Sequence, residues 1–333
     1  MLLAASLVPA LVPALVARGQ TQVLIVSGLG GDPVYSARFA KLSRELGDAL
    51  VQRVGIPASS VVRLGEDSVR AEPMYAGRST KGNIEGQFAR IAASARPGSQ
   101  VVIVLLGHGA GEGADSRLSI PGPDLTAADF ARLLARLSAQ RVAFLDLTSA
   151  SGDMLPVLSA PNRVVITATR SAIERNESQF ATWFVQAFSK DGADTDKDDR
   201  VSLLEAFRYA VAETRRAYEA DSRILTEHAQ LDDNGDRTGT GEPNGRTGDG
   251  LVARRFFLDM GALAARGGAV DARLPALYGE KFTLEEAVEA HKLRKPQLAA
   301  EAYGSELERL LIALARKAHE IRAIEGRAIE GRK

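Results

Sequence analysis

The chain has 333 residues, 45% of them hydrophobic and 25% charged, a composition typical of a folded globular protein that excludes disorder throughout. Its 42 basic residues balance 42 acidic ones, so no overall positive charge attracts nucleic acid, and we expect no nucleic-acid partner. Cysteine is absent, which excludes disulfides, zinc–thiolate sites and a cysteine nucleophile. The length fits one large α/β domain with an appendage.

Residues 2–17 carry no charged side chain and include Pro9 and Pro13. The stretch is short for a membrane span and its prolines interrupt a helix, so we predict a signal peptide over residues 1–17 and no stable membrane span. This predicts export to the periplasm or the extracellular space. The start of a signal peptide carries a basic residue, and none precedes this apolar run. A mis-assigned start codon or a buried helix, with cytoplasmic residence, is the alternative.

Between residues 20 and 260, short apolar runs alternate with segments of helical periodicity. The pattern predicts strands at 22–27, 59–64, 101–106, 141–147, 163–169 and 251–258, and helices at 34–54, 83–95, 126–137, 178–189 and 202–220. This alternation predicts a mostly parallel sheet covered by helices on both faces, with ligands at the carboxyl ends of the strands. Polar clusters at 107–109, 148–152 and 169–171 follow three of these strands, so we expect them to meet at one edge.

Three segments carry a resemblance to a known peptidase family. They are LLGHGAGEG (105–113), FLDLTSASGDMLPVL (144–158) and VVITATRSA (164–172). In order and strand context they resemble the legumain-like cysteine peptidases, relatives of caspases and gingipains, over about residues 20–260. The resemblance implies a caspase-hemoglobinase-like three-layer α/β/α sandwich.

The resemblance assigns roles to three residues. His108 takes the position of the catalytic histidine, and Gly109 the position whose N–H helps to bind the oxyanion. Ser149 stands where the family has its nucleophilic cysteine. A serine hydroxyl is a weaker nucleophile than a thiolate and needs a base oriented by an acid behind it. Asp146 lies three residues before Ser149 and is either such a charged support or a structural residue.

The roles of His108 and Ser149 each have a structural alternative. His108 stands between two glycines and is otherwise a loop residue that serves turn geometry. For Ser149 the alternative is a hydroxyl that caps the following helix, which we favour over nucleophilic attack. Around Ser149 the sequence lacks the Gly-x-Ser-x-Gly pattern that an esterase-type serine hydrolase needs.

Residues 194–205 have the spacing of an EF-hand calcium loop. The expected ligands are the side chains of Asp194, Asp196, Asp198, Ser202 and Glu205 and the carbonyl of Arg200. Asp199 stands where an EF-hand has glycine, which predicts modest affinity. The alternative is a solvated acidic turn. A second run, 232–236, lacks a glutamate at the twelfth position, and we expect 232–250 to be a flexible acidic loop.

After residue 267 the chain becomes rich in Ala, Glu, Lys, Leu and Arg. We predict a helical hairpin over 268–326, with helices at 283–295 and 296–326, the first capped by Thr283. It either offers a surface for a helical partner or packs as a terminal helix of the same domain. Residues 323–333 form a tail with the repeat AIEGR-AIEGR, which resembles a protease-tag site and is left out of the fold prediction.

These features predict a legumain-like peptidase homologue that binds a peptide or protein segment in its cleft. With Ser149 in place of cysteine, peptide-bond hydrolysis is expected to be weak or absent. The alternative is a pseudopeptidase that acts as a calcium-stabilised binding or scaffold protein. In both cases Ca²⁺ is the expected cofactor, in a structural role.

Overall fold

The computed structural model describes residues 21–67, 71–161, 163–198, 200–246, 248–258 and 271–330. The predicted signal peptide, Asp199 of the acidic loop and the last three residues of the repeat tail lie outside these ranges. None of the helices in the described ranges has the length and hydrophobicity that crossing a bilayer requires.

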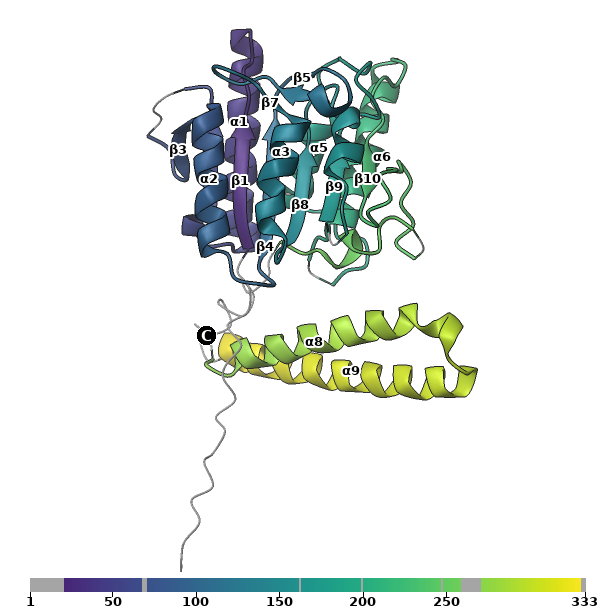
Figure 1. The fold of residues 1–333 in the computed structure, drawn as a ribbon. Coiled ribbons are helices and arrows are strands. Elements are labelled where there is room, and N and C mark those ends of the chain that lie inside the picture. The colour runs from purple at the N-terminus through teal and green to yellow at the C-terminus, as the bar shows by residue number, and fades with distance from the viewer. Residues whose placement is uncertain are drawn as a thin grey trace, which may run out of the picture.

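A seven-stranded sheet forms the centre of the molecule, in the order β10-β9-β8-β4-β1-β2-β3 (Figure 1). All neighbouring strands run parallel except β10, which is antiparallel to β9. The strands are β1 (Thr21–Ser27), β2 (Val61–Gly65), β3 (Tyr75–Arg78), β4 (Gln100–Leu106), β8 (Arg141–Asp146), β9 (Arg163–Thr167) and β10 (Gln230–Asp232). The mostly parallel sheet predicted from the alternating pattern is thus confirmed.

Helices cover both faces of the sheet and make three layers. One face packs against α1 (Pro33–Ala49), α5 (Phe180–Ser189) and α6 (Leu203–Ala220), and the other against α2 (Lys81–Ser94), α3 (Ala127–Leu134) and the short α4 (Leu155–Leu158). Because both faces are covered, all seven residues of β4 are buried, which explains its unbroken apolar run.

Local signals set several helix starts. Thr126 and Asp129 form a capping box at the start of α3, and Ser202 and Glu205 form another at the start of α6. The helix 34–54 ends in a π-helical turn, Leu50–Val54, that Gly55 closes with a left-handed φ of 89°.

A small antiparallel sheet of β5 (Gly109–Ala110), β6 (Arg117–Leu118) and β7 (Leu125–Thr126) was not predicted. Two-residue strands carry no periodicity, and these form because the chain after His108 folds back on itself, with Ser119 N–H donating to the His108 carbonyl. The sequence analysis also missed β3 and β10 at the two edges of the large sheet, because four and three residues are too few to show a period.

The predicted strand at 251–258 is wrong. Residues Ala253–Arg255 form a 3₁₀ turn, because the buried carboxylate of Asp233 accepts the N–H groups of Gly250, Val252 and Ala253 and bends the chain there. Asp232 and Asp233, which begin the loop expected to be flexible, are therefore built into the fold. Asp232 ends β10, and Asp233 is 2% exposed.

The C-terminal segment is a hairpin of α8 (Leu274–Leu293) and α9 (Ala300–Glu330), drawn below the sheet on the side away from β5 and β7 (Figure 1). Leu274, Leu277, Ile321 and Ile324 are buried within it. The predicted cap at Thr283 is wrong, because α8 begins nine residues earlier and the Thr283 hydroxyl donates back to the Gly279 carbonyl inside the helix.

Candidate functional site

His108 and Ser149 follow two neighbouring parallel strands. β4 ends at Leu106 and β8 at Asp146, and the two strands pair over six residues. Parallel strands end at the same edge, so both residues lie in loops at the carboxyl edge of the sheet.

The His108 ring packs between two aromatic side chains of α1. The rings of Tyr35 and Phe39 meet it edge-on, each with its centroid 5.0 Å from that of the imidazole. Gly107, with a φ of 149°, lets the chain turn sharply out of β4 into this position. Within the described residues, the ring nitrogens of His108 donate to and accept from no protein group, so no hydrogen bond to protein orients the imidazole.

Glu177 is a carboxylate close enough to His108 for the imidazole to affect its pKa. Burial raises the pKa of Glu177, while the charges of Arg38 and His108 act in the opposite direction. Arg38 holds this carboxylate in an ion pair, with 2.6 Å between Nη1 and Oε1. Glu177 is therefore paired with Arg38, and it is not an acid that hydrogen-bonds to the His108 imidazole.

Gly109 lies directly against Ser149. A Cβ atom added at Gly109 would come 2.3 Å from the Ser149 carbonyl oxygen and 2.9 Å from Thr148 Oγ1. No side chain fits in that space, so the two loops approach as closely as they do because residue 109 is glycine.

Hydrogen bonds hold the Ser149 loop from both sides. Thr148 donates from its N–H and its hydroxyl to Asp146 Oδ1, the latter at 2.6 Å. In the loops after β8 and β9, the Thr169 N–H donates to Ser151 Oγ and the two hydroxyls share a hydrogen bond, and Ala150 N–H donates to the Glu174 carbonyl. These contacts hold Ala150 at a left-handed φ of 53°, a conformation that costs about 1 kcal/mol or more for a residue with a side chain.

Ser149 itself is 2% exposed, and within the described residues its hydroxyl makes no hydrogen bond. The expectation that this hydroxyl caps the next helix is wrong. The chain enters a 3₁₀ turn, Gly152–Met154, after Ser151, and that turn has no side-chain cap. The loop is held by its neighbours and not by Ser149.

Asp146 is completely buried behind the loop. Burial raises its pKa to about 7, although the two hydrogen bonds from Thr148 favour the ionised form. Its second oxygen, Oδ2, has no hydrogen-bond partner in the described structure. Asp146 therefore acts as a structural acceptor for Thr148, and it makes no contact that would orient His108.

A second histidine at this edge was missed by the sequence analysis. His228 precedes β10, whose Gln230 pairs with Thr167 at the end of β9. Its Nδ1 lies 2.6 Å from Glu174 Oε1, and its N–H donates to the other oxygen of the same carboxylate. Because 54 residues separate the two partners, no local sequence pattern could have indicated the pair.

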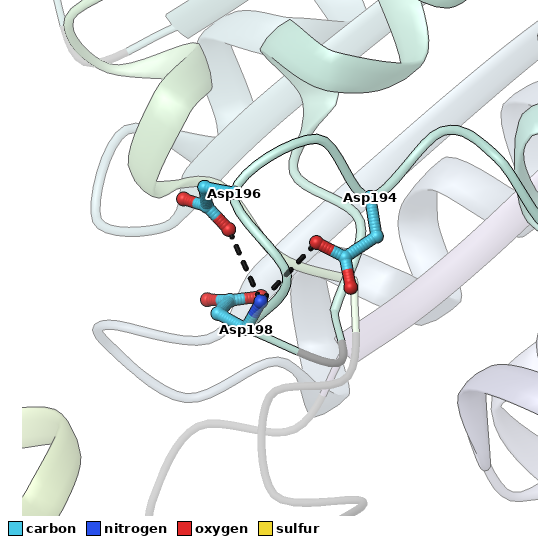
Figure 2. Close-up of side chains that lie close together, drawn as sticks. All are labelled: Asp194, Asp196 and Asp198. Atoms are coloured by element: carbon cyan, nitrogen blue, oxygen red, sulfur yellow. Dashed lines mark hydrogen bonds between the residues drawn. The ribbon is translucent and has the colours of Figure 1, made fainter.

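The acidic loop after α5 gathers three of its six predicted ligands. Oxygen atoms of Asp194, Asp196 and Asp198 all lie within 4.8 Å of one another, and the Asp198 N–H donates to the carboxylates of the other two (Figure 2). Burial of the carboxylate and repulsion from Asp196 raise the pKa of Asp198 to about 7, with Arg200 opposing, although the residue as a whole is exposed. Three oxygens so placed are a partial shell for a hard cation.

Glu205 and Ser202 are engaged elsewhere in this structure. Glu205 Oε2 accepts from the N–H and hydroxyl of Ser202, and Oε1 accepts from the N–H and hydroxyl of Thr195. Burial opposes the ionisation of Glu205, but these donors outweigh it and lower its pKa. Glu205 thus joins the acidic loop to the start of α6 as a cap.

Comparisons with known proteins match neither a family model nor a curated protein. Among solved structures, the chain is similar to a secreted C11 cysteine protease from Bacteroides thetaiotaomicron, solved with an irreversible peptide inhibitor. The two are 10% identical, with a TM-score of 0.39 over 75% of this chain and 70% of that chain.

Proposed function

We propose that this chain is a homologue of the legumain-like peptidases that binds an extended peptide segment across the carboxyl edge of its sheet. With Ser149 at the position of the nucleophile, it hydrolyses peptide bonds weakly or not at all. The observation that carries the proposal is the close approach of the His108–Gly109 turn to the Ser149 loop, which only a glycine at 109 permits.

Hydrolysis at this site needs three steps in order. Ser149 Oγ attacks the peptide carbonyl carbon while its proton passes to a ring nitrogen of His108, and the N–H of Gly109 stabilises the oxyanion. His108 then returns the proton to the departing amine, and water releases the acyl group by the reverse route.

Two features argue for a slow or absent reaction. The Ser149 hydroxyl is buried and has no hydrogen bond to His108 in the described structure, so the base does not activate it at rest. His108 also lacks a hydrogen-bonded acid, on which serine nucleophiles depend and cysteine nucleophiles do not. These features favour the second candidate, a pseudopeptidase that binds or scaffolds through the same edge.

The test is the substitution Ser149→Cys. A thiol next to His108 reaches the thiolate form far more readily than serine reaches an alkoxide. We expect the variant to be labelled by a peptide that carries a thiol-directed electrophile, and the wild type not to be. The double variant Ser149→Cys/His108→Ala is the matched control and should lose most of the labelling. A folded Ser149→Cys variant that stays unlabelled would mean that the edge is no peptide site.

We also propose that the acidic loop binds one structural Ca²⁺. The support is the set of three carboxylates within 4.8 Å and the raised pKa of Asp198, which a divalent cation would reverse. Arg200 would contribute its carbonyl. Ser202 and Glu205 would join only by exchanging contacts of the capping box for the ion. Export through a signal peptide, the remaining part of this proposal, is tested by sequencing the N-terminus of the secreted protein.

A further inference from the structure

A cavity of about 330 Å³ lies at the carboxyl ends of β1 and β2, against α1. It is one aromatic ring away from His108, because Phe39 lines the cavity and also packs on the imidazole. β4, which leads to His108, has β1 on one side and β8 on the other. At about 4.8 Å per strand and 3.4 Å per extended residue, a peptide that passes Ser149 reaches this cavity within about three to four residues.

Glu66 is an acidic group that hydrogen bonds hold in place in this cavity. Its Oε2 accepts hydrogen bonds from the Ser36 hydroxyl at 2.7 Å and from the Gly30 N–H at 3.3 Å. Within the described residues Oε1 has no partner and Glu66 is in no ion pair. Arg78 is close, but it donates to the main-chain carbonyl of Glu66 and not to its carboxylate.

The cavity wall has three charged residues, Arg63, Glu66 and Asp67, and the charge of Arg63 is already neutralised. Arg63 is 1% exposed, and its three nitrogens donate to Ser43 Oγ, the Pro73 carbonyl and Glu72 Oε2 at 3.1–3.3 Å. Glu72 supplies the counter-charge, so the guanidinium does not compensate Glu66. Ala37, Phe39 and Ala40 give the cavity an apolar wall beside the fixed carboxylate.

We propose that this cavity takes a lysine or arginine side chain of the bound peptide, with Glu66 as the residue that selects it. An aliphatic stem on the apolar wall and a cationic head at Oε1 match the two parts of the cavity. This inference rests on the proposed function in one respect: the side chain belongs to the peptide that crosses the edge at Ser149.

The experiment uses two probes that differ only in charge. Nα-acetyl-arginine methylamide carries a guanidinium, and Nα-acetyl-citrulline methylamide carries a neutral urea of nearly the same shape. Binding to the full chain is followed by NMR, from the backbone amide shifts of Gly30, Ser36 and Gly65. We expect the arginine probe to bind at least tenfold more tightly and to move these amides, with a preference that falls as salt is added.

Glu66→Gln should bring the two probes to equal affinity. Glu45→Gln is the matched control, because Glu45 is an exposed carboxylate on α1 outside the cavity, and it should keep the preference. Equal binding of both probes to the wild type, or shifts confined to other amides, would overturn the inference without needing a variant. Failure of the Ser149→Cys labelling with an intact arginine preference would instead overturn the proposed function, so the two failures are distinguishable.

Discussion

Asp146 and Asp198 both have a pKa of about 7, yet their surroundings differ. Asp146 is buried at the carboxyl edge, where Thr148 donates to one of its oxygens and further hydrogen bonds hold the loop that carries Ser149. Asp198 is exposed on the acidic loop, where two other carboxylates lie within 4.8 Å. The protein's own donors hold the edge, whereas the acidic loop places like charges together, which is the reason for proposing a cation there.

The largest effect is expected from filling the gap between the two edge loops. Gly109→Ala places a Cβ on the Ser149 carbonyl, so one loop must move, and we expect a loss of about 3 kcal/mol in the free energy of unfolding. Gly86→Ala is the matched control, because residue 86 lies in α2 with no atom within 4 Å of the new Cβ. It should stabilise the fold by about 1 kcal/mol. Denaturant unfolding measures the free energy of unfolding of both variants. A Gly109→Ala variant as stable as the wild type would show that the two edge loops are not held tightly.

Calcium should stabilise the acidic loop by a comparable amount. A ligand that binds only the folded state adds about 2.7 kcal/mol at a hundredfold excess over its Kd. The melting temperature should rise with millimolar calcium and fall with chelator, and Asp198→Asn should remove most of this response. Asp221→Asn, an exposed carboxylate at the end of α6, should respond as the wild type does. Identical melting curves in chelator and calcium would reduce the loop to an acidic turn.

Asp146→Asn tests the charge at the edge. The folded-state pKa of about 7 lies above that of an unfolded aspartate, so ionisation weakens the fold as pH rises from about 4 to about 7. The Asp146→Asn variant cannot ionise at this position, so it does not lose this stability as the pH rises. Its stability relative to the wild type should grow by about 2 kcal/mol between pH 5 and pH 8. Parallel stability profiles for the two proteins over that range would contradict the burial argument.

The smallest effect separates the two roles of Glu205. As a cap it accepts from Ser202 and Thr195, so Glu205→Ala should cost about 1 kcal/mol even in chelator. Any additional loss that appears only with calcium measures its part as a ligand. A variant as stable as the wild type in chelator would show that Glu205 contributes through the ion alone.

Much of the architecture was predictable because its causes are local. Unbroken apolar runs marked β4 and β8, and the Thr126–Asp129 spacing marked the start of α3. Once the strands were known to be parallel, His108 and Ser149 had to lie at the same edge, because each follows its strand by two or three residues. The sequence by itself thus determined the layers, the edge and the place of His108 and Ser149 along it.

Tertiary structure decided which groups pair. Glu174 with His228 and Glu66 with Ser36 join residues 54 and 30 positions apart, and no periodicity links such partners. The capping box of Ser202 and Glu205 has a local spacing, but the contact of Glu205 with Thr195, ten residues away, depended on how the acidic loop folded. Periodicity and capping act over a few residues, whereas hydrogen-bond partners at a sheet edge are chosen only after distant segments have packed.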